Sequence, residues 1–172
     1  MIEILILYTI KNREKTLYTI RKDIFEVFGA YTKPSIGTLH PALKRLYKNG
    51  AVTLSEKFSD GGKKSSYYGI SKKGFVCFKE LFFSTASDNP SLFYSQLQVR
   101  FATMGFLTLE DRKKFIEETK RKIELYAIDI QNKLNDEFLE LDYFQKEIMK
   151  KTLAEFKSIN DYMNKLKVDY GC

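Results

Sequence analysis

Apolar residues in the first fifty positions recur every three or four residues, a spacing that predicts three amphipathic helices. The first covers residues 2 to about 12, and the second follows a polar connector at 12–16 and ends before Gly29. Ser35 is a suitable N-cap for the third, and Gly50 is a suitable terminator. The predicted core positions are Ile2, Leu5, Ile6 and Ile10, then Ile20, Ile24 and Val27 with Phe28, then Ile36, Leu39, Leu43 and Leu46.

After Gly50 the pattern changes from a helical to an alternating period. Residues 52–58 and 66–70 predict two short strands, joined by a turn-rich basic loop at 59–64. Ser71 is a suitable N-cap for a further helix. Three helices followed by a basic hairpin are the elements, in order, of a winged helix-turn-helix.

The second half of the chain is predicted to be helical throughout. Thr108, with Asp111 three residues later, predicts the start of a long helix, and a break near Leu141–Asp142 separates it from a last one. Their apolar stripes are narrow, so they are expected to pack on each other or on a second chain. The fold class is therefore mainly α (an α+β winged helix): a winged helix-turn-helix domain at residues 1–85 and a helical dimerisation domain at 86–172.

The excess of positive over negative charge lies in the first half of the chain. The formal net charge is +7. Residues 1–80 hold 15 Lys and Arg against 7 acidic residues, and residues 81–172 hold 14 against 15. This asymmetry indicates that the first half meets a polyanion. A solvated basic surface without a partner explains the charge equally well.

The third helix is predicted to carry a second face without large apolar side chains. Small residues come first on this face and cations later, so its N-terminal end can approach DNA closely while the cations reach bases or phosphates. An ordinary surface helix would also carry Lys and Arg. Pro41 favours the DNA-binding interpretation. A proline inside a helix lowers its stability by about 3 kcal/mol, and such a residue is retained more easily where a special local shape is required. The predicted DNA-contacting residues are Ser35, Gly37, Thr38, Pro41, Lys44, Arg45 and Lys48.

The predicted wing adds contacts of its own. Lys63 and Lys64 lie at the hairpin tip and would enter the minor groove or hold phosphate. Ser66 and Tyr68 on the following strand are further candidates. Tyr67 and Tyr68 alternate across that strand, so one of them is expected in the core and the other to contact a phosphate through its hydroxyl. His40, at the edge of the third helix, either contacts DNA or packs beside Tyr47.

Two segments resemble the PadR-type transcriptional regulators. Residues 34–46, followed by Asn49-Gly50, are similar to that family's recognition helix, and residues 62–74 to its wing, strand and helix start. His40 stands where the family commonly has Tyr, and Leu17-Tyr18-Thr19 where it has Gly-Tyr-Glu. Tyr18 is kept, and the resemblance makes it a phosphate contact.

The resemblance implies a homodimeric repressor that binds double-stranded DNA at a pseudo-palindromic operator and pairs through its C-terminal helices. Some members are released by a small molecule, and an aromatic content of 15% leaves room for an aromatic effector here. The Phe residues of the second half are also explained as core. A second hypothesis is a winged-helix module whose basic face binds an acidic protein and has no specific DNA site.

Several classes of protein are not expected from the sequence. A single His and two Cys cannot form a zinc site, and no glycine-rich phosphate loop is present, so neither an enzyme nor a cofactor is predicted. No stretch of about 18 residues lacks a charge, so no transmembrane helix is predicted. A cytoplasmic location is expected from the low cysteine content.

Overall fold

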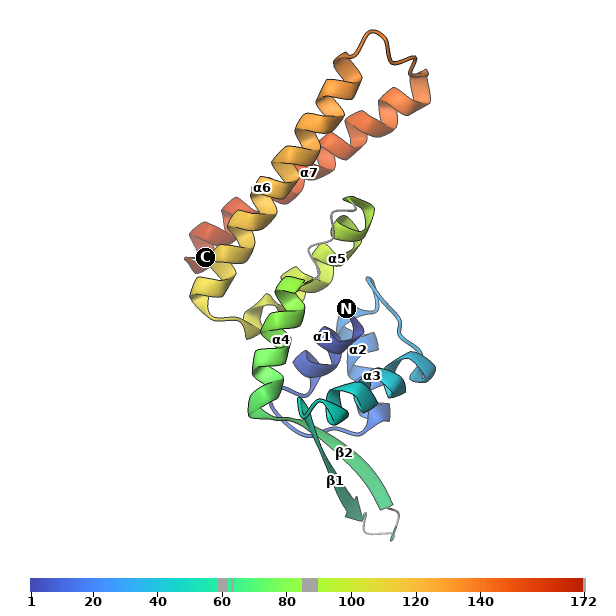
Figure 1. Cartoon of the computed structure of the whole chain (residues 1–172), viewed down its shortest axis with the longest axis vertical. Helices are drawn as coiled ribbons and strands as arrows, with labels where there is room; N and C mark the ends of the chain where they lie inside the picture. Colours follow the sequence, from blue (N-terminus) through green and yellow to red (C-terminus); the bar gives the residue numbers. More distant parts are fainter. Residues whose placement is uncertain (59–61, 63, 85–89, 172) are drawn as a thin grey trace. The chain divides into compact units, whose positions relative to one another are not determined.

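The computed structural model describes every residue except 59–61, 63, 85–89 and 172. Backbone contacts divide the chain into two compact units, Met1–Phe106 and Leu107–Cys172. The first contains α1 (Ile2–Thr9), α2 (Leu17–Phe28), α3 (Ile36–Lys48), β1 (Val52–Phe58), β2 (Lys64–Ile70), α4 (Lys72–Ser84), α5 (Pro90–Thr103) and the 3-10 turn η1 (Met104–Phe106) (Figure 1). The second contains α6 (Leu109–Asn135) and α7 (Tyr143–Tyr170). This order confirms the predicted winged helix followed by helices.

Helix α1 is the centre of the first unit. Four consecutive residues, Ile4 to Leu7, are fully buried, so its apolar surface extends all the way round. A helix of this kind must be surrounded by others, and α1 packs against α2, α3, α4 and α5. It ends at Thr9 rather than near residue 12, because the chain turns at the buried Ile10. In α2, Ile20, Ile24 and Phe28 form the buried face, whereas Val27 is exposed, contrary to the prediction.

Side-chain caps set the helix starts where the sequence places them. The hydroxyls of Thr16, Ser35 and Thr108 each accept a hydrogen bond from the backbone N–H three residues later. Asp142 and Gln145 form a reciprocal capping box at the start of α7. Gly50, just beyond α3, has φ +74°, the left-handed conformation that glycine adopts most easily.

Strands β1 and β2 form the antiparallel wing, in a register that pairs Val52 with Ile70 and Phe58 with Lys64. A third segment joins it at one point. Lys15 donates its N–H to the carbonyl of Tyr68 at 3.0 Å and accepts the Tyr68 N–H at 2.8 Å. The α1–α2 connector is thereby hydrogen-bonded to the edge of the wing.

In the second unit, α6 and α7 form an antiparallel hairpin (Figure 1). Phe115 and Ile123 of α6 and Phe156 and Met163 of α7 are buried, as expected for two helices that share one stripe. Many other apolar residues of this unit are exposed, namely Leu109, Leu125, Ile128, Phe138, Leu139, Tyr143, Phe144, Ile148, Tyr162, Val168 and Tyr170. Among the described residues, no helix is both long and apolar enough to cross a membrane.

Candidate nucleic-acid interface

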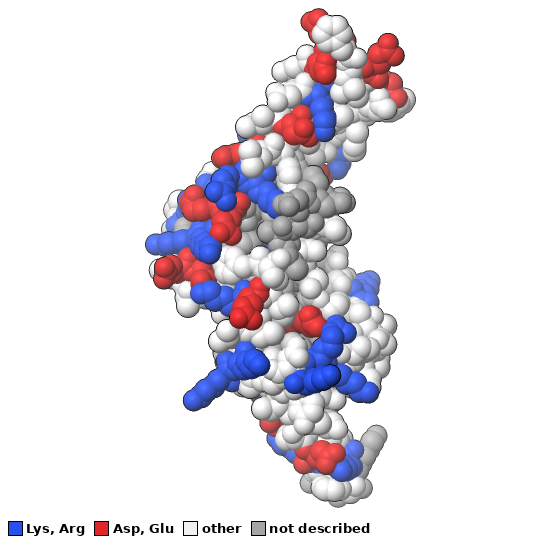
Figure 2. All heavy atoms as spheres, viewed as in Figure 1, with Lys and Arg blue, Asp and Glu red and all other residues white. Residues whose placement is uncertain are grey.

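The exposed face of α3 is built as the sequence pattern predicts, with one exception. Leu39, Ala42, Leu43 and Leu46 are buried, and at 100° per residue the positions opposite them are Gly37, Pro41, Lys44 and Lys48. All four of these are exposed. Lys and Arg side chains gather over α3 in the space-filling view, whereas both signs of charge mix on the wing (Figure 2).

Ile36 is the exception, because it was expected in the core and is 45% exposed. It is the first residue of α3 and lies on the side of the helix that faces the start of α2 and the wing. Ala42, about 120° away at the opposite edge of the apolar stripe, is buried instead. Helical spacing alone could not distinguish these two, because both lie at the boundary of the apolar stripe.

The N-terminal half of α3 is largely exposed, including Gly37 and Pro41. The Ser35 hydroxyl accepts the Thr38 N–H at 3.2 Å, which satisfies one of the backbone donors that the first turn of a helix leaves without a partner inside the helix. Pro41 lies inside the helix and cannot donate to the carbonyl of Gly37. Because this face is exposed, water or a ligand can donate a hydrogen bond to the Gly37 carbonyl. This limits the loss of helix stability caused by an interior proline.

Three separate segments form a groove beside α3. Tyr18 at the start of α2, His40 on α3, and Ser66 and Tyr68 on β2 line a hollow of about 390 Å³. Thr16, Leu17, Ile36 and Ser65 complete it. Hydroxyl groups, an imidazole and the N-terminus of α2 therefore face one space, a set of groups that suits phosphate. Tyr18 is 68% exposed, so its hydroxyl is available. His40 lies in this groove.

Three of the cations near this surface are paired with carboxylates. Arg45 Nε lies 2.9 Å from Glu3 Oε1, and Lys64 Nζ lies 2.7 Å from Glu56 Oε2. Lys57 pairs with Glu14 at 2.7 Å. Lys44 and Lys48 have no such partner within the described part of the chain. Lys63 was also predicted to contact DNA and lies outside the described residues.

Glu14 fixes β1 to the α1–α2 connector. Its carboxylate accepts hydrogen bonds from Lys57 Nζ and, at 3.0 Å, from the Ser55 hydroxyl. These bonds, from Lys57 first, hold the pKa of Glu14 below its ordinary value, and the same contact raises the pKa of Lys57. The sequence analysis missed Lys57. It lies in the strand predicted at 52–58, six residues before the basic pair at the tip, and that position is the signal that could have identified it.

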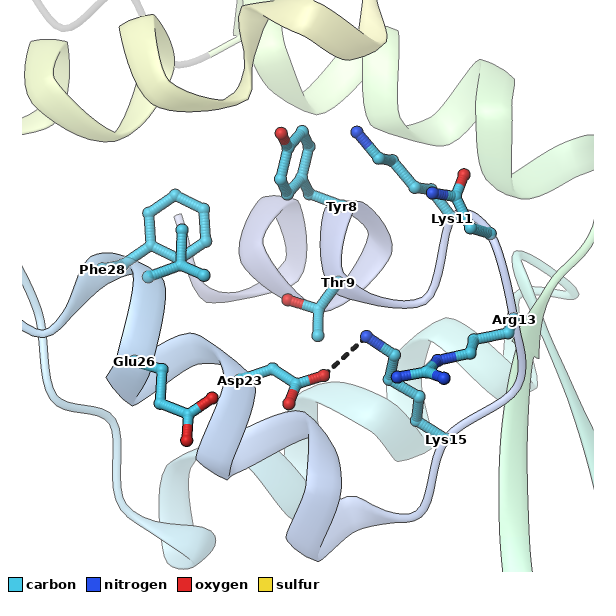
Figure 3. Close-up of a pocket in the computed structure, with 10 residues that line it drawn as sticks. Tyr8, Thr9, Lys11, Arg13, Lys15, Asp23, Glu26 and Phe28 are labelled. Atoms are coloured by element: carbon cyan, nitrogen blue, oxygen red, sulfur yellow. Dashed lines mark hydrogen bonds and ion pairs between the residues drawn. The ribbon is translucent and has the colours of Figure 1, made fainter.

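The connector also lines a second hollow, of about 390 Å³, between the end of α1 and the second half of α2 (Figure 3). Lys15 Nζ lies 2.6 Å from Asp23 Oδ2, and these side chains are only 13% and 24% exposed. Tyr8 and Phe28 meet edge to face at 5.9 Å, and Lys11 Nζ lies 3.9 Å from the Tyr8 ring centre. Lys15 thus connects the α1–α2 connector to α2 through its side chain and to β2 through its backbone.

Residues 6–80 match the family model described as "Transcriptional regulator PadR-like family". No curated protein matches the sequence. Among solved structures, Bacillus subtilis PadR in complex with operator DNA aligns over 95% of this chain and 96% of its own, with 15% identity and a TM-score of 0.44. The smu.1604c protein of Streptococcus mutans aligns over 97% and 98%, with 22% identity and a TM-score of 0.43. A transcriptional regulator from Clostridium thermocellum aligns over 46% and 76%, with 25% identity and a TM-score of 0.42.

Proposed function

Since residues 6–80 are a PadR-like transcriptional regulator domain, we propose that this protein binds double-stranded DNA through α3 and its wing and acts as a homodimeric repressor. The family consists of transcription regulators rather than enzymes, in line with the prediction from the sequence. The observation that carries the proposal is the outer face of α3. It presents Gly37 and Pro41 near the helix start and Lys44 and Lys48 further along, with no large apolar side chain among them.

This face suits a major groove. Its small residues let the backbone approach the bases, and Lys44 and Lys48 extend to base edges or phosphates. Ser35 and Thr38 lie at the N-terminal end, where the helix dipole favours a phosphate. Arg45 lies on one flank of the face and His40 on the other, since each is about 70° from its centre at 100° per residue.

The groove of Tyr18, His40, Ser66 and Tyr68 suits the DNA backbone beside that helix. Its hydroxyl and imidazole groups can donate to phosphate oxygens without reading the sequence. Lys64 adds charge at the wing, and the same role is proposed for Lys63. Because β2 is hydrogen-bonded to Lys15, the wing strand and the start of α2 are held at a fixed spacing.

Dimerisation is proposed through residues 86–172. The described part of this region exposes large apolar side chains, including Phe138, Phe144 and Ile148, which a second copy would cover. A two-fold dimer presents two recognition helices, so the operator is expected to be pseudo-palindromic with half-sites one or two helical turns apart. Release by an aromatic small molecule is a prediction of the family resemblance alone.

The central test is selection of duplexes from a random pool by the full chain, followed by fluorescence anisotropy. The selected duplex and a scrambled version are titrated over a salt series. We expect enrichment of an inverted repeat and preference for it over the scrambled duplex. Binding should fall steeply with salt, because each neutralised phosphate contributes about −0.9 to the slope of log K against log[salt].

Matched variants connect this result to α3. Lys44→Ala with Lys48→Ala should weaken binding and make the salt slope shallower by about 2 per recognition helix. Lys113→Ala with Lys157→Ala removes the same charge from exposed sites on α6 and α7 and should change little. No enrichment, or equal losses from the two pairs, would contradict the proposal and support binding to an acidic protein.

The dimer has a separate test. Phe144→Glu with Ile148→Glu places two charges on the exposed apolar surface of α7, where 79% and 56% of these side chains are accessible. Sedimentation should then change from dimer to monomer, with helix content unchanged by circular dichroism. A variant that remains fully dimeric would place the interface elsewhere.

A further inference from the structure

Arg45, a cation on the surface of α3, is hydrogen-bonded to a residue of another helix, α1. Its Nε donates to Oε1 of Glu3 at 2.9 Å, a contact between residues 42 positions apart. The Glu3 side chain is only 23% exposed, whereas that of Arg45 is 62% exposed. Lys44 and Lys48, its neighbours on the outer face, have no ion-pair partner among the described residues.

Glu3 is a rigid support. It stands in the first turn of α1, where the helix dipole favours a carboxylate. The residues that follow it, Ile4 to Leu7, are fully buried, and α1 packs against α3. Glu3 therefore cannot follow Arg45 if that side chain swings outward, and the contact fixes where the guanidinium lies.

The contact leaves most of the guanidinium available. Arginine has five N–H donors in one plane, and Glu3 is bonded to the one on Nε. The four donors on Nη1 and Nη2 remain, and within the described residues no other hydrogen bond or ion pair involves the Arg45 side chain. Two parallel N–H groups of this kind match the O6 and N7 acceptors of guanine in the major groove. A side chain already held by Nε loses less conformational entropy on making that contact.

We propose that Glu3 is a positioning residue that holds Arg45 for a base-edge contact, which makes Arg45 a source of sequence discrimination. The proposal rests on the DNA-binding function proposed above. It assigns a different role to Lys44 and Lys48, whose unheld side chains supply affinity that depends on salt more than on sequence. If Glu3 merely neutralised the charge of Arg45, removing Glu3 would strengthen binding to every duplex instead of reducing discrimination between duplexes.

The test compares the affinity ratio of the selected duplex to the scrambled duplex across variants of the full chain. Glu3→Ala should lower this ratio about fivefold or more, the discrimination expected from one bidentate base contact. Glu3→Gln keeps an oxygen that can accept from Nε, so it should retain most of the ratio. The matched control is Glu56→Ala, which removes the carboxylate paired with Lys64 on the wing. It should tighten binding to both duplexes and leave the ratio unchanged.

A double-variant cycle identifies Arg45 as the residue through which Glu3 acts. Arg45→Ala should lower the ratio at least as much as Glu3→Ala, and combining the two should lower it no further. The inference is overturned if Glu3→Ala leaves the ratio unchanged, if Glu3→Gln loses as much as Glu3→Ala, or if Glu3→Ala has its full effect without Arg45. A wild-type protein without preference for any selected duplex would instead contradict the proposed function. Thermal unfolding by circular dichroism confirms that each variant is folded.

Discussion

Replacement of Gly74 by alanine is expected to destabilise the first unit, although alanine is the better helix former. Gly74 is buried in the first turn of α4, where the chain returns from the wing to the helical core. A Cβ at this position would lie 2.2 Å from the carbonyl oxygen of Ala51 and 2.6 Å from Cγ1 of Ile70. An ordinary carbon–oxygen contact is about 3.3 Å, so α4 and the start of β1 would have to separate by about 1 Å.

That separation would act on contacts which now hold the two segments together. Ser71 donates its N–H to Ala51 at 3.1 Å and its hydroxyl to the Gly50 carbonyl at 2.6 Å. Overpacking costs about 1–3 kcal/mol, and each weakened hydrogen bond about 1 kcal/mol. The helical preference for alanine returns about 1 kcal/mol. We therefore expect a net loss of about 2–4 kcal/mol in the free energy of unfolding, by combining these terms for two weakened hydrogen bonds.

Urea and thermal denaturation of the full chain would measure this loss. For a unit of about 100 residues, such as Met1–Phe106, each kcal/mol lost from the free energy of unfolding lowers Tm by about 4–8 °C. Gly37→Ala is the matched control, because a Cβ there meets only the Ser35 hydroxyl oxygen at an ordinary 3.6 Å. That variant should be at least as stable as the wild type. A Gly74→Ala protein as stable as the wild type would refute the close approach of α4 to Ala51.

Other perturbations test the cap of α3, the wing and the core. Ser35→Ala removes the acceptor for the Thr38 N–H and should lower the free energy of unfolding by about 1 kcal/mol, measured in urea. The pKa of Glu14 is lowered by Lys57, so its stabilising contact is present above its ordinary pKa and is lost as the pH falls through the lower folded value. NMR shifts of the Ser55 and Lys57 amides should therefore change more under acidic conditions in the wild type than in Glu14→Gln. Phe78→Ala empties a site that is 1% exposed and should cost about 3–5 kcal/mol. A loss below about 1 kcal/mol would contradict its place in the core.

Local chemistry made much of the fold predictable. Ser35 and Thr108 cap helices because their hydroxyls reach a backbone N–H three residues away, an interaction that needs no distant partner. Gly50 ends α3 because it adopts a positive φ. The strands and the outer face of α3 follow from periods of two and 3.6 residues, which the sequence displays directly. The groups on that face, from Gly37 to Lys48, were therefore identifiable as a set.

Contacts between distant segments were not predictable from those periods. The groove requires the start of α2, α3 and β2 to converge, and it moves Ile36 from the expected core to an exposed wall. The pairing of Arg45 with Glu3 depends on how α1 packs across α3. The requirement for glycine at position 74 arises because α4 approaches Ala51.

The sequence by itself therefore determined the elements, their caps, the winged-helix order and the cationic face of α3, because each depends on residues within a turn or two of one another. Only the tertiary structure decided which of those cations are held, by which carboxylates, and which hydroxyl groups share one groove. These properties depend on the packing of helices and strands from separate parts of the chain. Hydrophobic periodicity specifies which face of an element is buried, but not which other element that face packs against.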